Sequence, residues 1–532
     1  MKRISAALFV CIFLALTVSS VYAIVEVFQT KSELIQYNPE KAYNGYTLWT
    51  TIGGAGGDVP RLIDMEGNVV HEWKPEISVW KPYLWEDGTL TGRFIQSLGP
   101  SGGSLATVDW DGNTLWQWEF PPERTDNPAV HHDEWIIFNK ALNKKTRISL
   151  MYFNPTNEEI WAAGGDPAID YVASNRNTNQ DGIVEVDMDT NEIIWEWHFM
   201  DHTVQDRNGA WPNYGVIAEN PGKLDIFHKT DQSQPSGNEG VVRDWHHCNS
   251  LDYNPTLGFI AVNAKHWSEF YVIDHDGTFV SDAAAFAADP AAALAANVAA
   301  AASDAGDFLY RFGNPSAYQQ GDPPGFQNEG NQQMYGSHNI HWIKETAYEG
   351  GPPLPGAGNF MIFNNGCYNP RGYHSEALEI NPYIDATGTD TGTYVNPPDA
   401  GYVGGGNSRQ IVWSFASRNP QSFYGRHISG DQRLPNGNTL ICSGTPGHFF
   451  EVTESGEVVW EYINPGMNRR TLITDTLDGG NVYRAYRYPP DYPGFAGKDL
   501  SALGPMTEIY LGGAMNKFRE SKTGFHGVVV AP

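Results

Sequence analysis

Cysteine is scarce in this chain. Only 4 of the 532 residues are cysteine, and their spacing matches no zinc-binding motif. Cys11 lies in an apolar segment at the amino terminus, so the folded body would keep Cys248, Cys367 and Cys442. Three cysteines allow at most one disulfide, and we expect structural thiols in strands rather than a metal centre.

Basic residues are also few. The chain has 34 of them against 62 acidic residues, for a formal net charge of −28. A surface of this sign repels nucleic acids and anionic lipids, so we expect neither as a partner. No G-x-x-x-x-G-K-[ST] loop occurs, which argues against a nucleotide site of the P-loop kind.

Long apolar runs are confined to the amino terminus. Lys2 and Arg3 precede apolar residues 4–18, and Val21-Tyr22-Ala23 fits a signal-peptidase site. The run is too short to serve comfortably as a permanent membrane anchor. We therefore predict that residues 1–23 are a cleaved signal peptide. The mature protein would be periplasmic or extracellular, with no membrane span.

What the chain does have is a repeated segment. Each copy alternates apolar and polar residues with period two around an acidic or glycine-containing turn, which predicts a β-hairpin. The copies begin at Arg61, Ala106, Val184, Tyr271, Leu378 and Phe450. A lone hairpin cannot bury its apolar face, whereas a closed ring of repeated four-stranded sheets can. The sequence therefore predicts an all-β fold, a six-bladed β-propeller with long loop insertions.

The repeats run almost from end to end and leave no room for a second core. We expect the propeller over 61–520, preceded by 24–60 as a segment that supplies a ring-closing strand and followed by 521–532 as a tail. An alanine-rich insertion at 282–304 would be a short helix or a disordered flap. Four tryptophans at equivalent positions of the repeats should pack between blades: Trp73, Trp118, Trp197 and Trp460.

Histidines precede several hairpins, where the innermost strand of each blade would begin. The segments are His131-His132, D-W-H-H-C-N-S from Asp244, S-H-N-I-H-W-I from Ser337 and Y-G-R-H-I-S-G from Tyr424. Innermost strands line the central channel of a propeller, so these imidazoles would gather at one mouth of the channel. This repetition is the strongest functional signal in the sequence.

At these segments the chain resembles the bacterial arylsulfate sulfotransferase family. Shared phrases include D-W-x-H-x-N-S at Asp244, Y-R-F-G-N-P at Tyr310, L-P-G-A-G-N-F-M-I-F-N-N-G at Leu354 and I-S-G-D-Q-R-L-P-N-G-N-T-L-I at Ile428. The resemblance covers nearly the whole mature sequence. It implies a six-bladed propeller, export and transfer of a sulfuryl group from a phenolic sulfate donor to a phenol acceptor. The transfer would use no nucleotide and would pass through a sulfohistidine in the channel.

The resemblance also implies site residues. His247 and Asn249 match the family's channel histidine and its companion, and His338 matches the histidine of a second family segment. His341 would lie on the opposite pleat of that strand, or beside His338 if the segment loops. Arg371 follows N-N-G, roughly where the family places a sulfate-binding arginine.

One position departs from the family pattern. The family's sulfated histidine opens the tetrapeptide H-E-W-Y, whereas the aligned tetrapeptide here is Q-S-F-Y, so Gln421 stands at the nucleophile's position. A carboxamide cannot replace imidazole as a nucleophile. His427, six residues on, or His247 would then have to take this role. The expected catalytic set is thus His247, His338 and His427, with Asn249, His341 and Arg371 as substrate-binding residues.

Three functions stay open on the sequence. The first is an exported arylsulfate sulfotransferase-like enzyme without a cofactor, in which imidazoles attack and transfer protons while arginine holds sulfate oxygens. The second is a non-catalytic propeller that binds a ligand in its channel. The third is a metalloprotein, with a transition metal ion held by His247, His338, His341 and His427.

Overall fold

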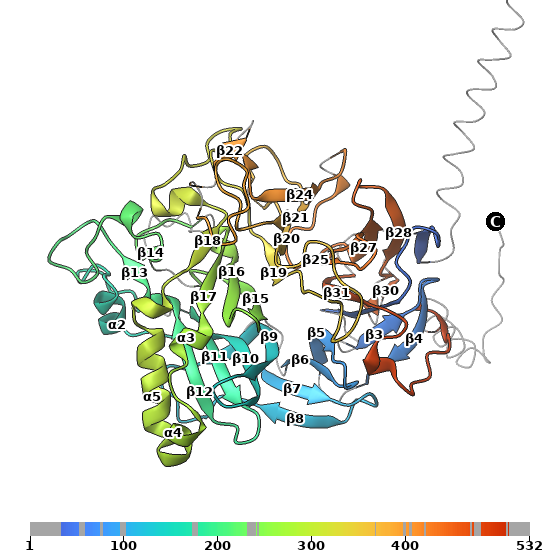
Figure 1. Cartoon of the computed structure of the whole chain (residues 1–532), viewed down its shortest axis with the longest axis horizontal. Helices are drawn as coiled ribbons and strands as arrows, with labels where there is room; N and C mark the ends of the chain where they lie inside the picture. The colour runs from blue at the N-terminus through green and yellow to red at the C-terminus, as the bar shows by residue number, and fades with distance from the viewer. Residues whose placement is uncertain are drawn as a thin grey trace, which may run out of the picture.

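Six antiparallel sheets stand around a central axis in the computed structural model (Figure 1). It describes residues 33–52, 59–74, 78–95, 103–172, 179–230, 241, 244–367, 369–396, 399, 401–403, 407–419, 422–465, 467–468, 471–472, 480–506 and 509. The predicted signal peptide, the tail 521–532 and Gln421 lie outside these residues. The predicted six-bladed β-propeller is confirmed.

The first three blades contain the following strands, in order from the innermost strand outward. Blade 1 consists of β31 (Val482–Tyr488), β2 (Tyr46–Thr51), β3 (Pro60–Ile63), β4 (Asn68–Glu72) and β32 (Gly504–Pro505). Blade 2 consists of β5 (Ser78–Leu84), β6 (Leu90–Ile95), β7 (Ser104–Val108) and β8 (Thr114–Trp118). Blade 3 consists of β9 (Ala129–Asn139), β10 (Lys144–Phe153), β11 (Gln180–Asp187) and β12 (Ile193–His198).

The other three blades follow the same order. Blade 4 consists of β15 (Cys248–Asn254), β16 (Phe259–Ala264), β17 (Glu269–Asp274) and β18 (Tyr310–Phe312). Blade 5 consists of β19 (His338–Trp342), β20 (Phe360–Asn364), β21 (Glu376–Ile380) and β24 (Ile411–Phe415). Blade 6 consists of β25 (Gly430–Arg433), β26 (Thr439–Ser443), β27 (His448–Val452), β28 (Val458–Ile463) and β1 (Leu34–Tyr37).

Strands from the two ends of the chain share two blades. β31, from the carboxy-terminal part, is the innermost strand of blade 1 and pairs with β2, while β1 forms the outer edge of blade 6 beside β28. Arg487 of β31 donates from Nε to Thr47 Oγ1 at 2.7 Å and lies 3.3 Å from Glu451 of β27. These contacts tie blade 1 to blade 6.

Tryptophans of the outer strands join neighbouring blades, as predicted. Trp118 donates to Asn191 O at 3.0 Å, and Trp460 donates to Met65 O at 2.9 Å. Both indoles are buried, so each apolar ring fills the seam between two blades while its N–H satisfies a turn carbonyl.

The insertions carry the helices and the small sheets. The α-helices are α2 (Asn157–Ala162), α3 (His275–Thr278), α4 (Ala283–Ala288) and α5 (Pro290–Ala301). The 3-10 turns are η1 (Phe199–Asp201), η2 (Ile217–Glu219), η3 (Lys265–Trp267), η4 (Asp304–Gly306), η5 (Pro315–Tyr318) and η7 (Pro493–Phe495). The paired short strands are β13 (Thr203–Val204) with β14 (Leu224–Asp225), β22 (Tyr402–Val403) with β23 (Asn407–Ser408), and β29 (Met467–Asn468) with β30 (Thr471–Leu472).

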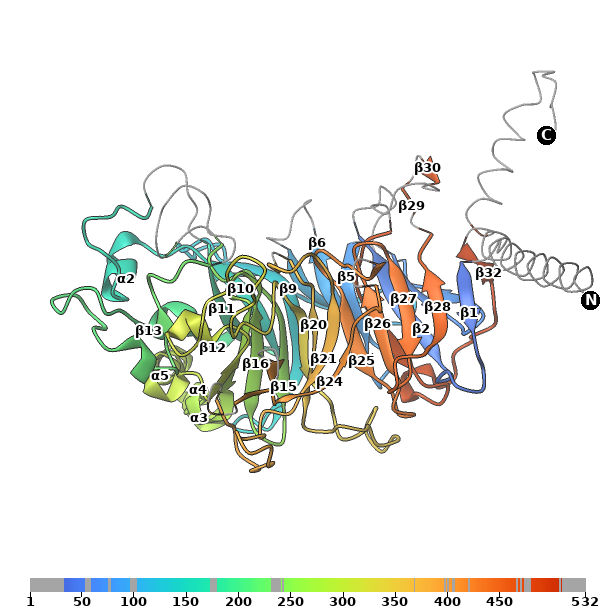
Figure 2. The same ribbon diagram turned by 90° about the horizontal axis from the view of Figure 1, so that it is seen from above.

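The tight hairpin predicted at Tyr271 is wrong. Asp274 caps α3 by accepting from Gly277 N at 2.7 Å, and the alanine-rich segment then forms α4 and α5 before β18 returns to pair with β17. The helices lie at the rim of the ring in Figures 1 and 2. Asn297 of α5 anchors them by donating to Ile194 O of β12 at 2.8 Å.

Two further sequence expectations concern disulfides and the membrane. The three described cysteines are free and buried. Burial raises the pKa of the Cys248 and Cys442 thiols. Among the helices of the described ranges, none combines the length and apolar character needed to cross a bilayer.

Candidate functional site

Unusual backbone conformations gather where the innermost strands begin. Positive φ angles occur at His132 (48°), Asp244 (56°), His247 (50°), Asn339 (65°) and Ile428 (52°). Strands β15 and β19 also carry a register shift near these ends. Such conformations cost about 1–3 kcal/mol each and persist only where their surroundings impose them, which is common at functional sites. This end of the channel is therefore the candidate site.

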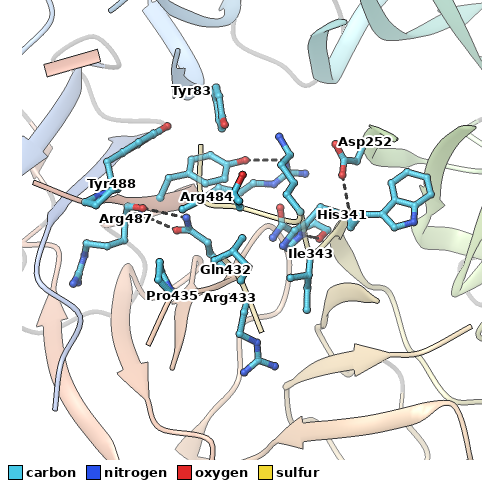
Figure 3. Close-up of a pocket in the computed structure, with 18 of the residues that line it drawn as sticks. Tyr83, Asp252, His341, Ile343, Gln432, Arg433, Pro435, Arg484, Arg487 and Tyr488 are labelled. Carbon is cyan, nitrogen blue, oxygen red and sulfur yellow. Dashed lines mark hydrogen bonds between the residues drawn. The ribbon is translucent and has the colours of Figure 1, made fainter. Parts of the chain in front are cut away.

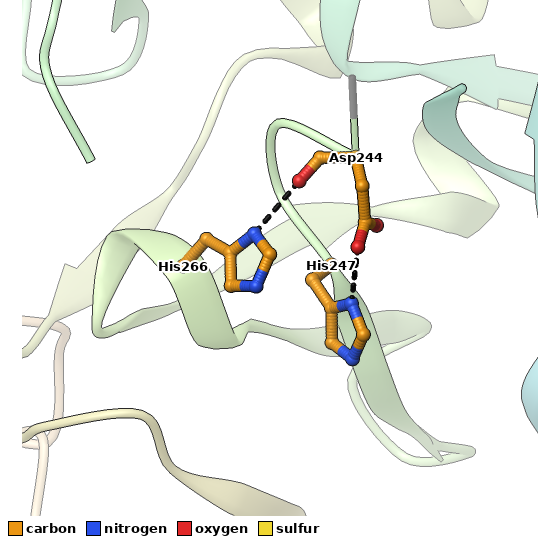
Figure 4. A group of neighbouring side chains, drawn as sticks. All are labelled: Asp244, His247 and His266. Carbon is orange, nitrogen blue, oxygen red and sulfur yellow. Dashed lines mark hydrogen bonds and ion pairs between the residues drawn. The ribbon is translucent and has the colours of Figure 1, made fainter. Parts of the chain in front are cut away.

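Asp244 orients two imidazoles with two different oxygens (Figure 4). Its carboxylate Oδ2 lies 2.6 Å from His247 Nδ1, and its backbone carbonyl lies 2.7 Å from Nδ1 of His266 in η3. Because a carbonyl can only accept, the proton of His266 is on Nδ1, and the carboxylate favours the same tautomer in His247. Each ring then keeps a lone pair on Nε2, and Figure 4 shows both Nε2 atoms on the side away from Asp244.

The two rings are packed against each other. Their centroids are 4.7 Å apart and their planes differ by 24°. Burial, followed by the influence of His247, lowers the pKa of His266 to about 3. Burial would raise the pKa of Asp244, but the charge and hydrogen bond of His247 outweigh it and lower that pKa to about 2. At neutral pH the site therefore contains an ionised carboxylate and a neutral His266.

A second group of polar side chains from blade 3 reaches the same place. The ring of His132 lies 4.9 Å from that of His247, and His132 Nδ1 is 2.8 Å from Nδ1 of His131. His131 Nε2 in turn lies 3.3 Å from Asp181 Oδ1, which also accepts from Cys248 N at 2.9 Å. A chain of contacts thus leads from a buried carboxylate to the channel mouth.

His338 stands nearby with both ring nitrogens engaged. Nδ1 lies 2.6 Å from Asn365 Oδ1, and Nε2 accepts from Ile428 N at 3.2 Å. Burial, followed by the charge of Lys265, lowers the pKa of His338, and His247 and His427 contribute in the same direction. His338 therefore fixes the entry to β25, while His427 lies exposed beside it.

The comparison with known families points to the same part of the chain. A family model described as arylsulfotransferase (ASST) matches residues 135–383, which include Asp244, His247, His266 and His338. The chain contains an arylsulfotransferase family domain. The family suspected from the sequence is thereby confirmed, and the match ends before His427.

Solved structures resemble the chain only distantly. A protein of unknown function from Bacteroides caccae is 10% identical with a TM-score of 0.37, over 84% of this chain and 98% of its own. The WD40 domain of coronin from Toxoplasma gondii is 9% identical with a TM-score of 0.33, over 82% of this chain and 71% of its own. A search of curated proteins gives no match.

Of the three predicted catalytic residues, His247 and His427 both lie close enough to His338 to lower its pKa. Asn249 lies next to them, but its amide is used within the fold. Its Nδ2 donates to Ser337 O at 2.8 Å, and its Oδ1 accepts from Asn263 Nδ2 at 2.9 Å. Asn249 therefore ties blade 4 to the entry of blade 5.

Arg371 makes its contacts elsewhere. Its guanidinium lies 3.0 Å from Glu329 Oε2, and 52% of the side chain is exposed. Within the described part of the chain its ion pair is with this loop carboxylate and not with the histidine group. The sequence position expected for a sulfate-binding arginine thus carries a partly exposed, already paired cation.

His341 faces a different cavity, deeper along the same strands (Figure 3). Its Nδ1 lies 2.9 Å from Asn339 O, and burial lowers its pKa to about 4. The cavity holds about 90 Å³ and is lined by Tyr83, Trp135, Asp252, His341, Lys344, Arg433, Arg484, Tyr486 and Arg487, among others. Its arginines are paired with carboxylates: Arg484 with Asp133 at 2.8 Å, Arg487 with Glu451 at 3.3 Å, and Arg433 with Glu379.

Two site residues were missed from the sequence. Asp244 opens the D-W-H-H-C-N-S segment and stands three residues before His247, so its spacing was a usable signal. His266 follows β16 in a short A-K-H-W segment that belongs to no motif. Only the folded chain places it against His247.

Proposed function

We propose that the protein is a sulfotransferase that exchanges a sulfuryl group between phenols, with His247 as the nucleophile. The proposal rests on the 2.6 Å contact between Asp244 and His247 at the channel mouth of an arylsulfotransferase domain. Asp244 holds the proton on Nδ1, so Nε2 keeps its lone pair for attack. The carboxylate also stabilises the positive charge that the ring acquires.

The reaction would run in two half-reactions. In the first, His247 Nε2 attacks the sulfur of an aryl sulfate, an N–S bond forms, and the S–O bond to the aryl group breaks. The phenolate leaves and takes a proton from solvent. In the second, an acceptor phenol loses its proton to solvent and attacks the same sulfur, and the N–S bond breaks. Neither half-reaction requires a nucleotide, and together they give ping-pong kinetics.

Sulfuryl oxygens need nearby positive charge during this exchange. Lys265 of η3 adjoins His266 in the chain and interacts electrostatically with both Asp244 and His338. We assign it the role of attracting the sulfate group, as cations do in the related phosphoryl transfers. This role replaces the one expected for Arg371, whose guanidinium is paired with Glu329.

Gln421, which stands where the family has its sulfated histidine, is consistent with His247 as the nucleophile. If His247 accepts the sulfuryl group, the chain does not need a histidine at that position. His338 offers a less suitable lone pair because its Nε2 accepts from Ile428 N. His427 lies outside the matched family segment and is exposed, which makes it the second candidate for the nucleophile.

We also propose that the enzyme acts after export, in the periplasm or outside the cell, as residues 1–23 predict. Amino-terminal sequencing of protein recovered from the expressing host's culture medium or periplasm tests this point. A mature chain that starts at Ile24 is the expected result, and an intact start at Met1 in the cytoplasm would contradict it.

The decisive experiment follows phenol release from a chromogenic aryl sulfate, with and without a second phenol and without nucleotide. We expect release that depends on the acceptor. Brief incubation with donor alone, acid-free digestion and mass spectrometry should place one SO3 group on the peptide that contains His247. A sulfuryl group on His427 would move the nucleophile there. A folded protein that releases no phenol from any of a broad donor panel would point to a ligand-binding propeller.

A further inference from the structure

The hydrogen bonds of Asp244 leave an unusual arrangement at the channel mouth. Two stacked imidazoles each have Nδ1 fixed by an oxygen of the same residue, so both Nε2 lone pairs lie on one side (Figure 4). Neither Nε2 has a hydrogen-bond partner among the described residues. Adjacent lone pairs repel each other unless an electron-poor atom lies between or beside them.

We infer that Nε2 of His247 and Nε2 of His266 form a binding site for one divalent transition-metal ion of the zinc or copper class. Imidazole is the ligand that these ions prefer among neutral side chains. Ligand atoms of Asp244, His247 and His266 lie within 4.8 Å of one another. Bonds of about 2.0–2.1 Å to a tetrahedral ion require neighbouring ligand atoms about 3.4 Å apart, so the two stacked rings would have to turn toward a common ion to bind it.

The surroundings of the two rings support a metal rather than simple packing. Metal-binding histidines usually donate their other N–H to a carboxylate or a backbone carbonyl, which fixes the tautomer and aims the lone pair. Here His247 donates to a carboxylate and His266 to a carbonyl. The positive φ angles of Asp244 (56°) and His247 (50°) are the backbone conformation that brings both oxygens into range.

Charges of both signs surround the site, because Lys265, next to His266 in the chain, opposes a bound cation whereas carboxylates attract one. The chain has a formal net charge of −28, which concentrates cations near its surface. Asp244 adds a carboxylate within the site itself.

This inference goes beyond the proposed sulfuryl transfer and does not depend on it. The ion and the sulfuryl group would use the same lone pair on His247, so they cannot occupy the site together. A bound metal would therefore inhibit exchange. Zinc or copper in the surroundings would set how much of the enzyme is active.

The test measures binding directly. Mature protein without a polyhistidine tag is stripped with chelator, dialysed against Zn²⁺ and analysed for retained metal. Cobalt titration gives a second readout, since a tetrahedral site produces a visible absorption band. We expect one equivalent of metal, with no metal retained by His247→Asn or His266→Asn, and a loss of about 10- to 100-fold in affinity at most where only a group bonded to a ligand is changed. Asp244→Asn, which keeps the shape of the side chain, should weaken binding less.

His448→Asn is the matched control. This imidazole also pairs with a carboxylate, Nε2 to Glu461 at 2.8 Å, but it lies on β27, away from the innermost strands. Its replacement should leave binding unchanged. Circular dichroism of each variant checks the fold. No retained metal, or equal retention by the His247→Asn/His266→Asn double variant, overturns the inference.

The two proposals can fail separately. Stoichiometric metal binding without phenol exchange would support the metal site and contradict the sulfotransferase. Phenol exchange that is unaffected by Zn²⁺, in protein that retains no metal, would support the sulfotransferase and contradict the metal site. Exchange that falls as the metal site fills supports both.

Discussion

Blade 4 carries two groups of histidine and carboxylate side chains in opposite proportions. At the channel mouth there are two imidazoles and one carboxylate. The carboxylate of Asp244 contacts His247, and the backbone carbonyl of Asp244 contacts His266. At the seam with blade 3 two carboxylates serve one imidazole. His275 Nε2 lies 2.8 Å from Glu185 Oε2, and its Nδ1 lies 2.9 Å from Asp276 Oδ1. Histidine and carboxylate side chains therefore leave imidazole lone pairs at the channel mouth but leave none at the seam.

The proportions decide the charge of each group. Burial would lower the pKa of His275, but Glu185 and Asp276 outweigh it and raise that pKa to about 9. His275 is thus an imidazolium at neutral pH, with both N–H groups donated and no nucleophilic or metal-binding atom left. His266 is neutral, because burial lowers its pKa to about 3. The seam is a structural ion pair, whereas the mouth is chemically available.

The largest effect should separate the two groups by activity. His247→Asn removes the proposed nucleophile, and we expect exchange to fall at least about 10⁴-fold, as losses of a nucleophile do in other enzymes. His275→Gln should leave the exchange rate of the folded fraction within a few-fold of the wild type. The assay is phenol release at matched concentrations of folded protein. Equal losses in both variants would remove the functional distinction between mouth and seam.

The second effect should separate them by stability. His275→Gln leaves Glu185 buried without its cation, and loss of one partner of a buried pair costs about 3–5 kcal/mol in free energy of unfolding. Glu185 also accepts from Asn139 Nδ2 at 2.9 Å and Thr146 Oγ1 at 2.5 Å, so its carboxylate cannot turn toward solvent. Urea unfolding measures the difference. In the partly exposed pair of His448 with Glu461, His448→Gln should cost no more than about 1 kcal/mol.

Much of this comparison could not be predicted from the sequence. Alternation and turns predict the blades, because local pattern and propeller packing agree there. The histidines near the inner strands could also be predicted, because they recur at the same point of several blades. The contact of Asp244 with His266, in contrast, depends on a positive φ angle and a backbone carbonyl, which no residue pattern encodes. Glu185 and His275 are 90 positions apart and meet only because blades 3 and 4 pack together.

The third effect is a loss of stability at high pH. The pKa of His275 rises from about 6.5 in the unfolded chain to about 9 in the folded protein, so its stabilising contribution is complete below pH 6.5 and disappears as the pH rises through 9. The difference corresponds to about 3 kcal/mol. Urea unfolding of the wild type between pH 6.5 and 9.5 should show the decline. A variant His275→Gln that declines equally would assign it to other groups.

The smallest effect tests Asp244 as the residue that orients both rings. Asp244→Asn keeps an oxygen that can accept from His247 Nδ1 but removes the charge that stabilises the imidazolium, so we expect exchange to fall about 10- to 100-fold. The His266 contact should survive, because it uses the backbone carbonyl. The fall should appear in kcat, with KM nearly unchanged, since the carboxylate acts on the charge that develops during attack. A rise in KM alone would instead mean that Asp244 contributes to substrate binding. The channel mouth would then differ from the seam by binding substrate and not by having a nucleophile that Asp244 activates.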